Sequence, residues 1–178
     1  TTTNERKTKT MPLTASENIG NKIDPIPPGV HVAVCYAVVD LGTQENKKFG
    51  GERRQCLVQW ELPECRGEFE KDGELQDLPR VISKRYTVSL GEKATLRRDL
   101  ESWRGRKFTA DELNGFDLQA LLGAPCQIQI VHQDGSEGRV FAGIGAIMAL
   151  PKGAEAPSET ENPSTFFSFE GEERPTIP

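Results

Sequence analysis

The stretch from residue 55 to residue 109 constrains the fold more than any other, because it joins two strand patterns to one helix pattern. In residues 55–62 and 81–90, apolar and polar side chains alternate with the period of two that is typical of a half-buried β-strand. The residues that follow carry an apolar stripe at spacings of four and three, which predicts an amphipathic helix. The stripe consists of Leu96, Leu100 and Trp103.

Two capping signatures predict where helices begin. In Ser89-Leu90-Gly91-Glu92 the serine can accept from an early helix N–H while the glutamate reaches back, which predicts the start of the longer helix. Thr109-Ala110-Asp111-Glu112 repeats the signature and predicts a shorter helical region that ends at Gly123. The side chains expected to be buried by this second region are Phe116, Leu118, Leu121 and Leu122.

Three more strands are predicted, over residues 29–42, 125–132 and 139–150, and residues 63–80 are expected to form a long acidic loop. In the last strand Gly143 and Gly145 leave bare backbone, which indicates either close approach of a ligand or a bend in a barrel wall. The side chains expected to point inward there are Val140, Ala142, Ile144, Ala146 and Met148.

The resulting element order is strand, strand, strand, helix, strand, strand, which is the order of the OB-fold. We therefore predict an all-β (β-rich α+β) protein, a five-stranded OB-fold-like barrel with a helix between strands 3 and 4. Only 35% of the 178 residues are hydrophobic, so part of the chain is expected to lie outside the core. The predicted organisation is a flexible N-terminal arm (1–27), the barrel domain (28–153) and an acidic C-terminal tail (154–178).

The two ends are polar, and they point to a soluble protein. No apolar run approaches about 20 residues and no signal peptide opens the sequence, so we expect no membrane span and a cytoplasmic location. The tail holds six acidic residues and one basic residue, and it also contains three phenylalanines that could dock on a partner or on this protein's own surface. These are Phe166, Phe167 and Phe169.

Cysteines and histidines give little support to a metal or catalytic site. Cys35, Cys56 and Cys126 each lie in an apolar run, where a free cysteine behaves as a small buried hydrophobe, and no CxxC pair is present. A zinc site that uses His31 and His132 is disfavoured, as is a disulfide framework. Because the sequence also lacks a phosphate-binding glycine loop, a Gly-x-Ser-x-Gly elbow and a His-x-Glu zinc motif, we expect no metal, no cofactor and no enzymatic activity.

Cationic and aromatic residues cluster at three places in the predicted barrel. A glycine pair, Gly50-Gly51, stands among cations in the loop after the first strand, where the OB-fold has a binding loop, although a solvated hairpin tip would look the same. Such clusters let bases stack while phosphates are neutralised. The candidate nucleic-acid-binding residues are Lys47, Lys48, Phe49, Arg53 and Arg54 in the loop, Lys84, Arg85 and Tyr86 in the third strand, and Arg139 and Phe141 in the fifth.

Two aromatic residues leave alternatives open. Trp60 shares a strand face with Cys56, Val58 and Leu62, which favours the core over a stacking platform. Tyr86 could equally stack a base or point inward with its hydroxyl satisfied.

Residues 28–153 also resemble a known group of proteins. The segments that carry the resemblance are DLGTQ, KFGG, QWELPE, SKRYTVSLGEKATLRRDLESWRGRKFTADELNGFDLQALLGAPCQIQIVH and ALPKG. They are similar to bacteriophage-encoded, replication-associated proteins that we connect with OB-fold single-stranded DNA-binding proteins.

The resemblance implies sequence-tolerant binding and protection of single-stranded DNA in phage DNA replication or recombination, in the host cytoplasm. It also implies a tail that recruits other replication or recombination proteins. This tail departs from the bacterial pattern, because its last acidic residues are followed by Arg174-Pro175-Thr176-Ile177-Pro178 and not by a terminal aromatic residue. The alternative is a non-enzymatic interaction module, an adaptor or inhibitor that uses the barrel and the Phe-rich tail. Either kind of protein could form oligomers.

Overall fold

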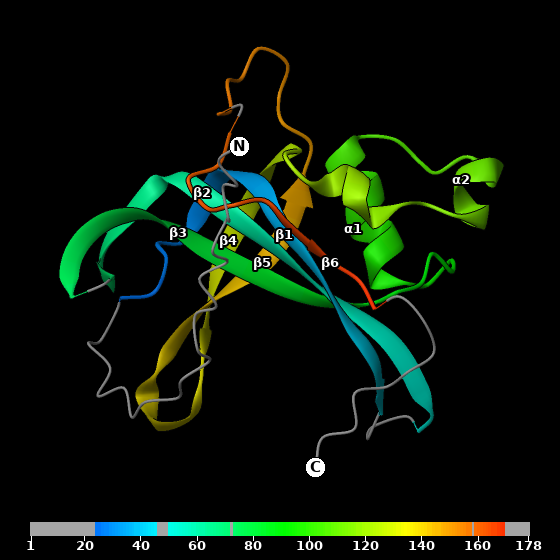
Figure 1. Ribbon diagram of the computed structural model, residues 1–178, viewed down its shortest axis with the longest axis horizontal. Coiled ribbons are helices and arrows are strands. Elements are labelled where there is room, and N and C mark those ends of the chain that lie inside the picture. The colour runs from blue at the N-terminus through cyan, green and yellow to red at the C-terminus, as the bar shows by residue number, and fades with distance from the viewer. Residues whose placement is uncertain (1–23, 46–49, 72, 158, 170–178) are drawn as a thin grey trace, which may run out of the picture.

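The computed structural model describes residues 24–45, 50–71, 73–157 and 159–169, and Figure 1 shows their arrangement. The predictions for residues 1–23 and for Lys47, Lys48 and Phe49 lie outside this part of the chain. The elements in chain order are β1 (Gly29–Glu45), β2 (Glu52–Lys71), β3 (Glu74–Thr87), α1 (Thr95–Arg104), α2 (Ala110–Asn114), the 3-10 turn η1 (Leu118–Leu121), β4 (Pro125–Asp134), the 3-10 turn η2 (Ser136–Gly138), β5 (Val140–Met148) and β6 (Thr165–Phe167).

Five antiparallel strands form one curled sheet in the order β3-β2-β1-β4-β5, a half-barrel that confirms the predicted OB-like fold class. Strand β1 is long enough to serve both halves, since residues 29–34 pair with β4 while residues 34–45 pair with β2. Helix α1 lies against the open side of this half-barrel (Figure 1). It is tied to β5 by Ser102, whose hydroxyl donates to the carbonyl of Ile147 at 2.6 Å.

The core is centred on two tryptophans, one from β2 and one from α1. Trp60 is fully buried, and its ring lies 5.7 Å from that of Trp103, centroid to centroid. The indole N–H of Trp103 donates to the carbonyl of Pro125 at 2.9 Å, which connects the helix to β4. The prediction that Trp60 belongs to the core is confirmed, as is the apolar stripe of α1. Neither helix in the described ranges has the length and apolar character that crossing a membrane requires.

The predicted acidic loop over residues 63–80 is wrong, because β2 and β3 continue through it as a two-stranded ribbon. After an irregularity between Leu62 and Arg66, the ladder runs from the Arg66–Pro79 pair to the Lys71–Glu74 pair. Exposed charged residues alternate there with partly buried Cys65, Gly67 and Phe69, so the period of two persists. The many acidic side chains made this stretch look like a solvated loop in the sequence. A two-stranded ribbon can still form there, because it satisfies its backbone hydrogen bonds without a deep core.

The two capping signatures have different outcomes. Helix α1 begins at Thr95, six residues after Ser89, and no side chain caps it. The Ser89 hydroxyl instead accepts from the backbone N–H of Gly91 at 3.2 Å, within a turn. The second signature is confirmed: the Glu112 N–H donates to the Thr109 hydroxyl at 3.3 Å, and the Thr109 N–H donates to the Glu112 carboxylate at 2.9 Å.

Replacing Thr109 with alanine should lower the free energy of unfolding by about 1 kcal/mol, because a satisfied N-cap contributes about that much. Urea denaturation measures the loss. Ser89→Ala, which removes the other signature's hydroxyl from an exposed turn, is the matched control and should change the free energy by less than about 0.5 kcal/mol. A larger loss from Ser89→Ala than from Thr109→Ala would contradict this assignment.

The predicted faces of the last strand are only partly correct. Ala142 and Ile144 pack against the core as predicted, and Val140 is exposed. A register shift between Gln129 and Ile130 of β4 reverses the alternation of β5 after Gly145, so Ile147 is the residue buried there. The β5 glycines make room for β4 side chains. A Cβ at Gly143 would lie 2.9 Å from Gln133 Nε2, and one at Gly145 would lie 2.9 Å from Val131 Cγ1. The expected bare backbone is therefore covered from within the sheet.

Segments at both ends of the described chain, outside the predicted barrel limits of 28 and 153, pack on the barrel. Ile26 is buried and its carbonyl accepts from the ring N–H of His132 at 2.9 Å. Strand β6 pairs in parallel with β1, from the Ala37–Thr165 pair to the Val39–Phe167 pair. Of the two alternatives for the phenylalanine-rich segment, docking on this protein's own surface is the one that the structure shows.

Candidate nucleic-acid interface

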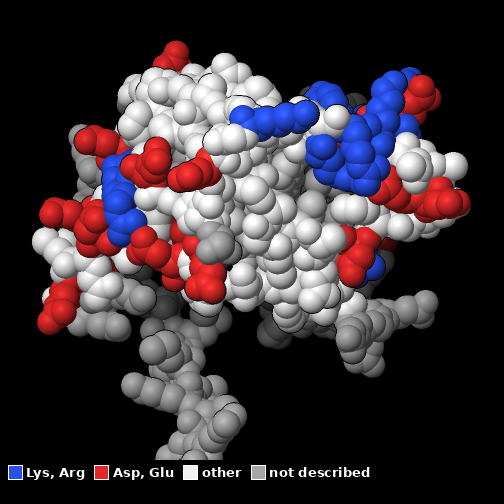
Figure 2. Space-filling model, turned by 90° about the horizontal axis from the view of Figure 1, so that it is seen from above, with Lys and Arg blue, Asp and Glu red and all other residues white. Residues whose placement is uncertain are grey.

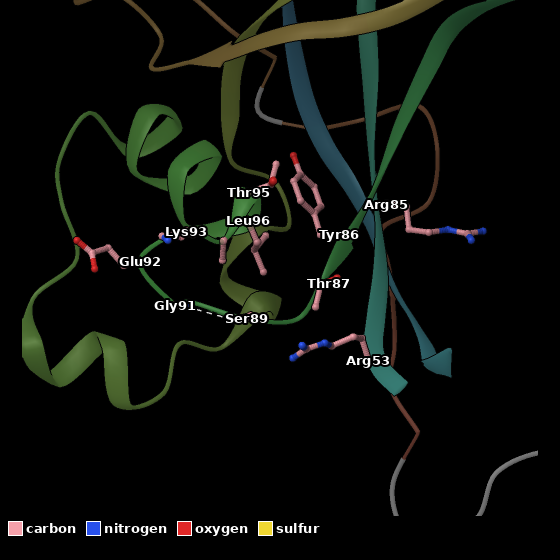
Figure 3. A pocket seen from close by; sticks show the side chains of 11 residues that line it. Arg53, Arg85, Tyr86, Thr87, Ser89, Gly91, Glu92, Lys93, Thr95 and Leu96 are labelled. Atoms are coloured by element: carbon pink, nitrogen blue, oxygen red, sulfur yellow. Dashed lines mark hydrogen bonds between the residues drawn. The ribbon is translucent and has the colours of Figure 1, made fainter. Parts of the chain in front are cut away.

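The predicted cations do not form one patch. Arg53 and Arg85 are exposed and line a pocket of about 550 Å³ where β2 begins and β3 ends. The opposite wall is the loop of residues 88–94 and the start of α1, which adds Lys93. Figure 3 shows Arg53 pointing from β2 toward the Ser89–Gly91 side of the pocket, while Arg85 extends in the opposite direction from β3.

Two cations of this pocket, Arg53 and Lys93, are available to an anion in it, because the side chain of Arg85 extends the other way (Figure 3). Arg53, Arg85 and Lys93 form no ion pair with any other described residue. The first turn of α1, which contributes Thr95 and Leu96 to the wall, contains no acidic residue. The positive end of the helix dipole therefore adds to the side-chain charge. One carboxylate, Glu92, also lines the pocket.

A second hollow of about 290 Å³ continues along α1 and shares Glu92, Lys93 and Ala94 with the first. It adds Arg97 and Arg98, together with Glu101. Glu101 accepts from Arg97 Nε at 3.1 Å, and the N–H of Phe108 and the Arg97 guanidinium lower the pKa of this carboxyl. We call the two neighbouring hollows the cationic groove, defined by Arg53, Lys93, Arg97 and Arg98.

Tyr86 and Lys84 belong to an internal network, so their assignment as surface ligands is corrected. Tyr86 is 4% exposed, and its hydroxyl donates to Asp99 Oδ2 at 3.0 Å. Lys84 Nζ lies 2.6 Å from the same oxygen. Burial, reinforced by the Asp99 carboxylate, raises the pKa of Tyr86, so the phenol stays protonated and keeps donating. Tyr86 points inward because it shares a strand face with buried Ile82.

Arg54 also has a structural role. Its Nε lies 3.1 Å from Asp40 Oδ2, and its Nη2 forms an ion pair with the same carboxylate. The hydrogen bond from Arg54 is the main cause that lowers the pKa of Asp40, and the N–H of Gly42 adds to it from 2.9 Å. Successive strand residues point to opposite faces, which is why Arg53 reaches the groove and Arg54 does not.

The third predicted cluster lies far from the groove. Arg139 immediately precedes β5, and Phe141, 53% exposed, lies within this strand on the β4–β5 hairpin, whose tip Figure 1 shows well away from α1. The Phe141 ring covers Gly135, where an added Cβ would lie 2.2 Å from Cε2 of the ring. Phe166 and Phe167 are 40% and 47% exposed and line a separate pocket of about 260 Å³ beside Val88 and Phe116.

Sequence reasoning missed Lys93, which the predicted helix start at Ser89 placed inside a helix. Arg97 and Arg98 lie off the apolar stripe of α1, and this was the signal that could have found them. The charged side chains of the described surface are also distributed so that the groove lies on a basic side of the molecule. Figure 2 shows basic side chains gathered on the side where Figure 1 places α1 and α2, and acidic side chains on the opposite side, where the β2–β3 ribbon turns.

The cysteines and histidines do not form a site within the described ranges. No three His, Cys, Asp or Glu side chains gather there in a way that could hold a metal ion. Burial raises the pKa of the Cys35 thiol to about 12 and that of Cys56 to about 11, so both remain neutral thiols. His31 and His132 are engaged with the carbonyl oxygens of Pro27 and Ile26. Comparison of the chain with protein-family models, curated proteins and solved structures finds no match.

Proposed function

We propose that this protein binds single-stranded DNA without sequence preference, through the cationic groove. The observation that carries the proposal is the pair of cations Arg53 and Lys93, which line one pocket and have no ion-pair partner among the described residues. The pocket lies at the ends of β2 and β3, and the OB-fold binds its ligands on this pair of strands and the loops beside it. In this proposal the protein is a binder and not a catalyst.

The shape of the groove favours a flexible strand over a duplex. A duplex presents its phosphates on a rigid convex cylinder, whereas the groove is a concave hollow between β3 and the 88–94 loop. A single strand can bend its backbone into such a hollow and place successive phosphates beside Arg53, Lys93 and Arg98. The hydroxyls of Thr87, Ser89 and Thr95 in the wall are additional donors to phosphate oxygens.

Phosphate contacts should dominate the binding energy in the described part of the groove. Its one aromatic lining residue is Tyr86, whose ring is buried. Base stacking by Phe49 stays a prediction, because that residue lies outside the described ranges. Binding should therefore tolerate any sequence and weaken steeply as salt rises, since each neutralised phosphate releases counterions.

The double variant Arg53→Ala/Lys93→Ala should weaken binding to labelled oligo-dT on the order of 10- to 100-fold at about 0.1 M salt. It should also reduce the slope of log K against log salt by about 1.4, because each lost single-strand phosphate contact contributes about 0.7. Fluorescence anisotropy titrations at several salt concentrations, with single-stranded and duplex probes, measure both quantities.

The matched control is Lys107→Ala/Lys152→Ala, which removes the same charge from exposed positions outside the groove. It should leave the slope nearly unchanged. An equal loss in both double variants would mean that only net charge matters and that the groove is not the site. A wild-type protein that binds neither probe at low salt would overturn the proposed function.

The cellular setting that we propose, phage DNA replication or recombination, is supported by the resemblance of residues 28–153 to phage-encoded replication-associated proteins. A second candidate function, a protein-interaction module, is favoured by the exposed rings of Phe166 and Phe167 beside an apolar pocket. Apolar docking would be nearly indifferent to salt, so the same titrations separate the two functions.

A further inference from the structure

Residues 159–169, which we call the C-terminal strap, are held at one end by a buried carboxylate. Glu61 of β2 is 1% exposed. Its oxygens accept from the backbone N–H of Glu161 at 3.0 Å, from that of Asn162 at 2.8 Å and from the Asn162 amide at 2.6 Å. Within the described ranges, all hydrogen-bond donors to this carboxylate come from the strap.

The other end of the strap is held by a second buried carboxylate. Asp40 of β1 accepts from the backbone N–H of Phe169 at 3.3 Å, and the Ser168 hydroxyl lies 3.5 Å from the same oxygen. Between the two ends, β6 adds a short parallel strand along residues 37–39 of β1. This length of β1 has a free edge for β6 because β4 pairs with β1 only as far as Val34.

These features make the barrel a receptor for an extended peptide. A buried carboxylate is unfavourable unless donors surround it, and an open strand edge invites another strand. Without the strap, Glu61 would lose its donors and β1 would expose its edge. The two carboxylates and the β1 edge bind mainly backbone groups of the strap. The strap of another copy has the same backbone groups and can therefore dock there equally well.

The strap is also connected in a way that lets it reach a second molecule. The preceding residues 149–157 include Pro151 and Pro157 and, as Figure 1 shows, rise away from the sheet as a loop. A stretch of this length spans about 30 Å when extended, roughly the diameter of a small domain. The strap buries little apolar surface, since Phe166 and Phe167 remain 40% and 47% exposed.

We infer that the C-terminal strap exchanges between copies of this chain, so that the strap of one molecule docks on β1 of another. A strap makes the same contacts whether it docks on its own barrel or on that of another molecule. The exchanged dimer therefore differs from the monomer mainly by a loss of translational freedom, and its population rises with protein concentration. This inference does not require DNA binding, although neighbouring molecules on one strand would raise the local concentration.

Mixed cysteine variants test the exchange in the full-length chain. Ala37→Cys in one preparation and Thr165→Cys in another change two residues that are paired across β1 and β6. Paired positions on adjacent strands have the Cα separation that a disulfide needs. After mixing and oxidation with oxidised glutathione, a disulfide-linked heterodimer is expected on a non-reducing gel, and its yield should rise with protein concentration.

The controls make each outcome informative. In a parallel mixture, Glu155→Cys replaces Thr165→Cys and places the cysteine at an exposed position in the loop before the strap. This mixture measures cross-linking that does not depend on strap docking, including any disulfide formed by native Cys65. The single-chain variant Ala37→Cys/Thr165→Cys should form an internal disulfide at low concentration, which verifies the docked register, and its thermal melt verifies folding.

An internal disulfide together with a heterodimer yield no higher than that of the Glu155→Cys mixture would show that the strap stays on its own barrel. That result overturns the inference. Failure to form the internal disulfide in a folded single-chain variant would overturn the docked strap itself. Neither result bears on oligonucleotide binding, so this inference and the proposed function fail separately.

Discussion

Replacing Asp99 with alanine should lower the free energy of unfolding by about 3–5 kcal/mol, because it removes one partner of a buried ion pair. Asp99 is buried and joins β3 to α1. Its carboxylate accepts from Lys84 Nζ at 2.6 Å and from the Tyr86 hydroxyl at 3.0 Å. Alanine would leave a buried phenol without an acceptor and a largely covered ammonium without a counter-ion.

Equilibrium denaturation with urea, followed by circular dichroism, measures this loss. Tyr86→Phe, which removes one hydrogen bond and keeps the carboxylate, should lower the free energy by only about 1 kcal/mol. Asp134→Ala, at an exposed aspartate, should change it by less than about 0.5 kcal/mol. If Asp99→Ala and Asp134→Ala behaved alike, the network would not be stabilising the junction of β3 and α1.

Replacing Trp103 with alanine should lower the free energy of unfolding by about 3–5 kcal/mol, the range for deleting a large buried aromatic side chain. The ring packs on Trp60 and its N–H donates to the carbonyl of Pro125, so the change empties the core and cuts the link from α1 to β4. Thermal and urea denaturation measure the effect.

Trp103→Phe is the matched control, because it keeps an aromatic ring and loses the hydrogen bond. It should recover more than half of the stability that alanine removes, since a single hydrogen bond contributes about 1 kcal/mol. Oligonucleotide affinity of the folded variants should stay unchanged, because Trp103 does not line the cationic groove. A selective loss of affinity in a stable Trp103→Phe protein would place this residue in the interface.

The fold was largely predictable because its signals are local. One strand is predicted by the alternation in residues 55–62, and one helix by the stripe of Leu96, Leu100 and Trp103. The order of the elements along the chain then predicts the barrel. The predictions that failed concern features that depend on how the strands pair with one another. The acidic ribbon of residues 63–80 looks like a loop until its two halves are placed side by side. The change of face in the second half of β5 follows from a register shift that no single strand encodes.

The candidate site was less predictable, for a similar reason. Period-two alternation separates Arg53 from Arg54 and turns Tyr86 inward, so those assignments could have been made from the sequence. The contribution of Lys93 could not, because it depends on how the 88–94 loop folds back against the end of β3. The partners of Glu61 lie 100 residues further along the chain, and nothing near Glu61 indicates them.

The separation of charge between the helical side and the β2–β3 ribbon gives the molecule a long-range orientation. Near any polyanion, one flank is attracted while the other is repelled, so the electric torque rotates the protein before the surfaces touch. This torque acts over about one Debye length, roughly 10 Å at 0.1 M salt. At low salt the protein should therefore meet a polyanion with its basic side first, whereas at high salt its orientation on encounter should be random.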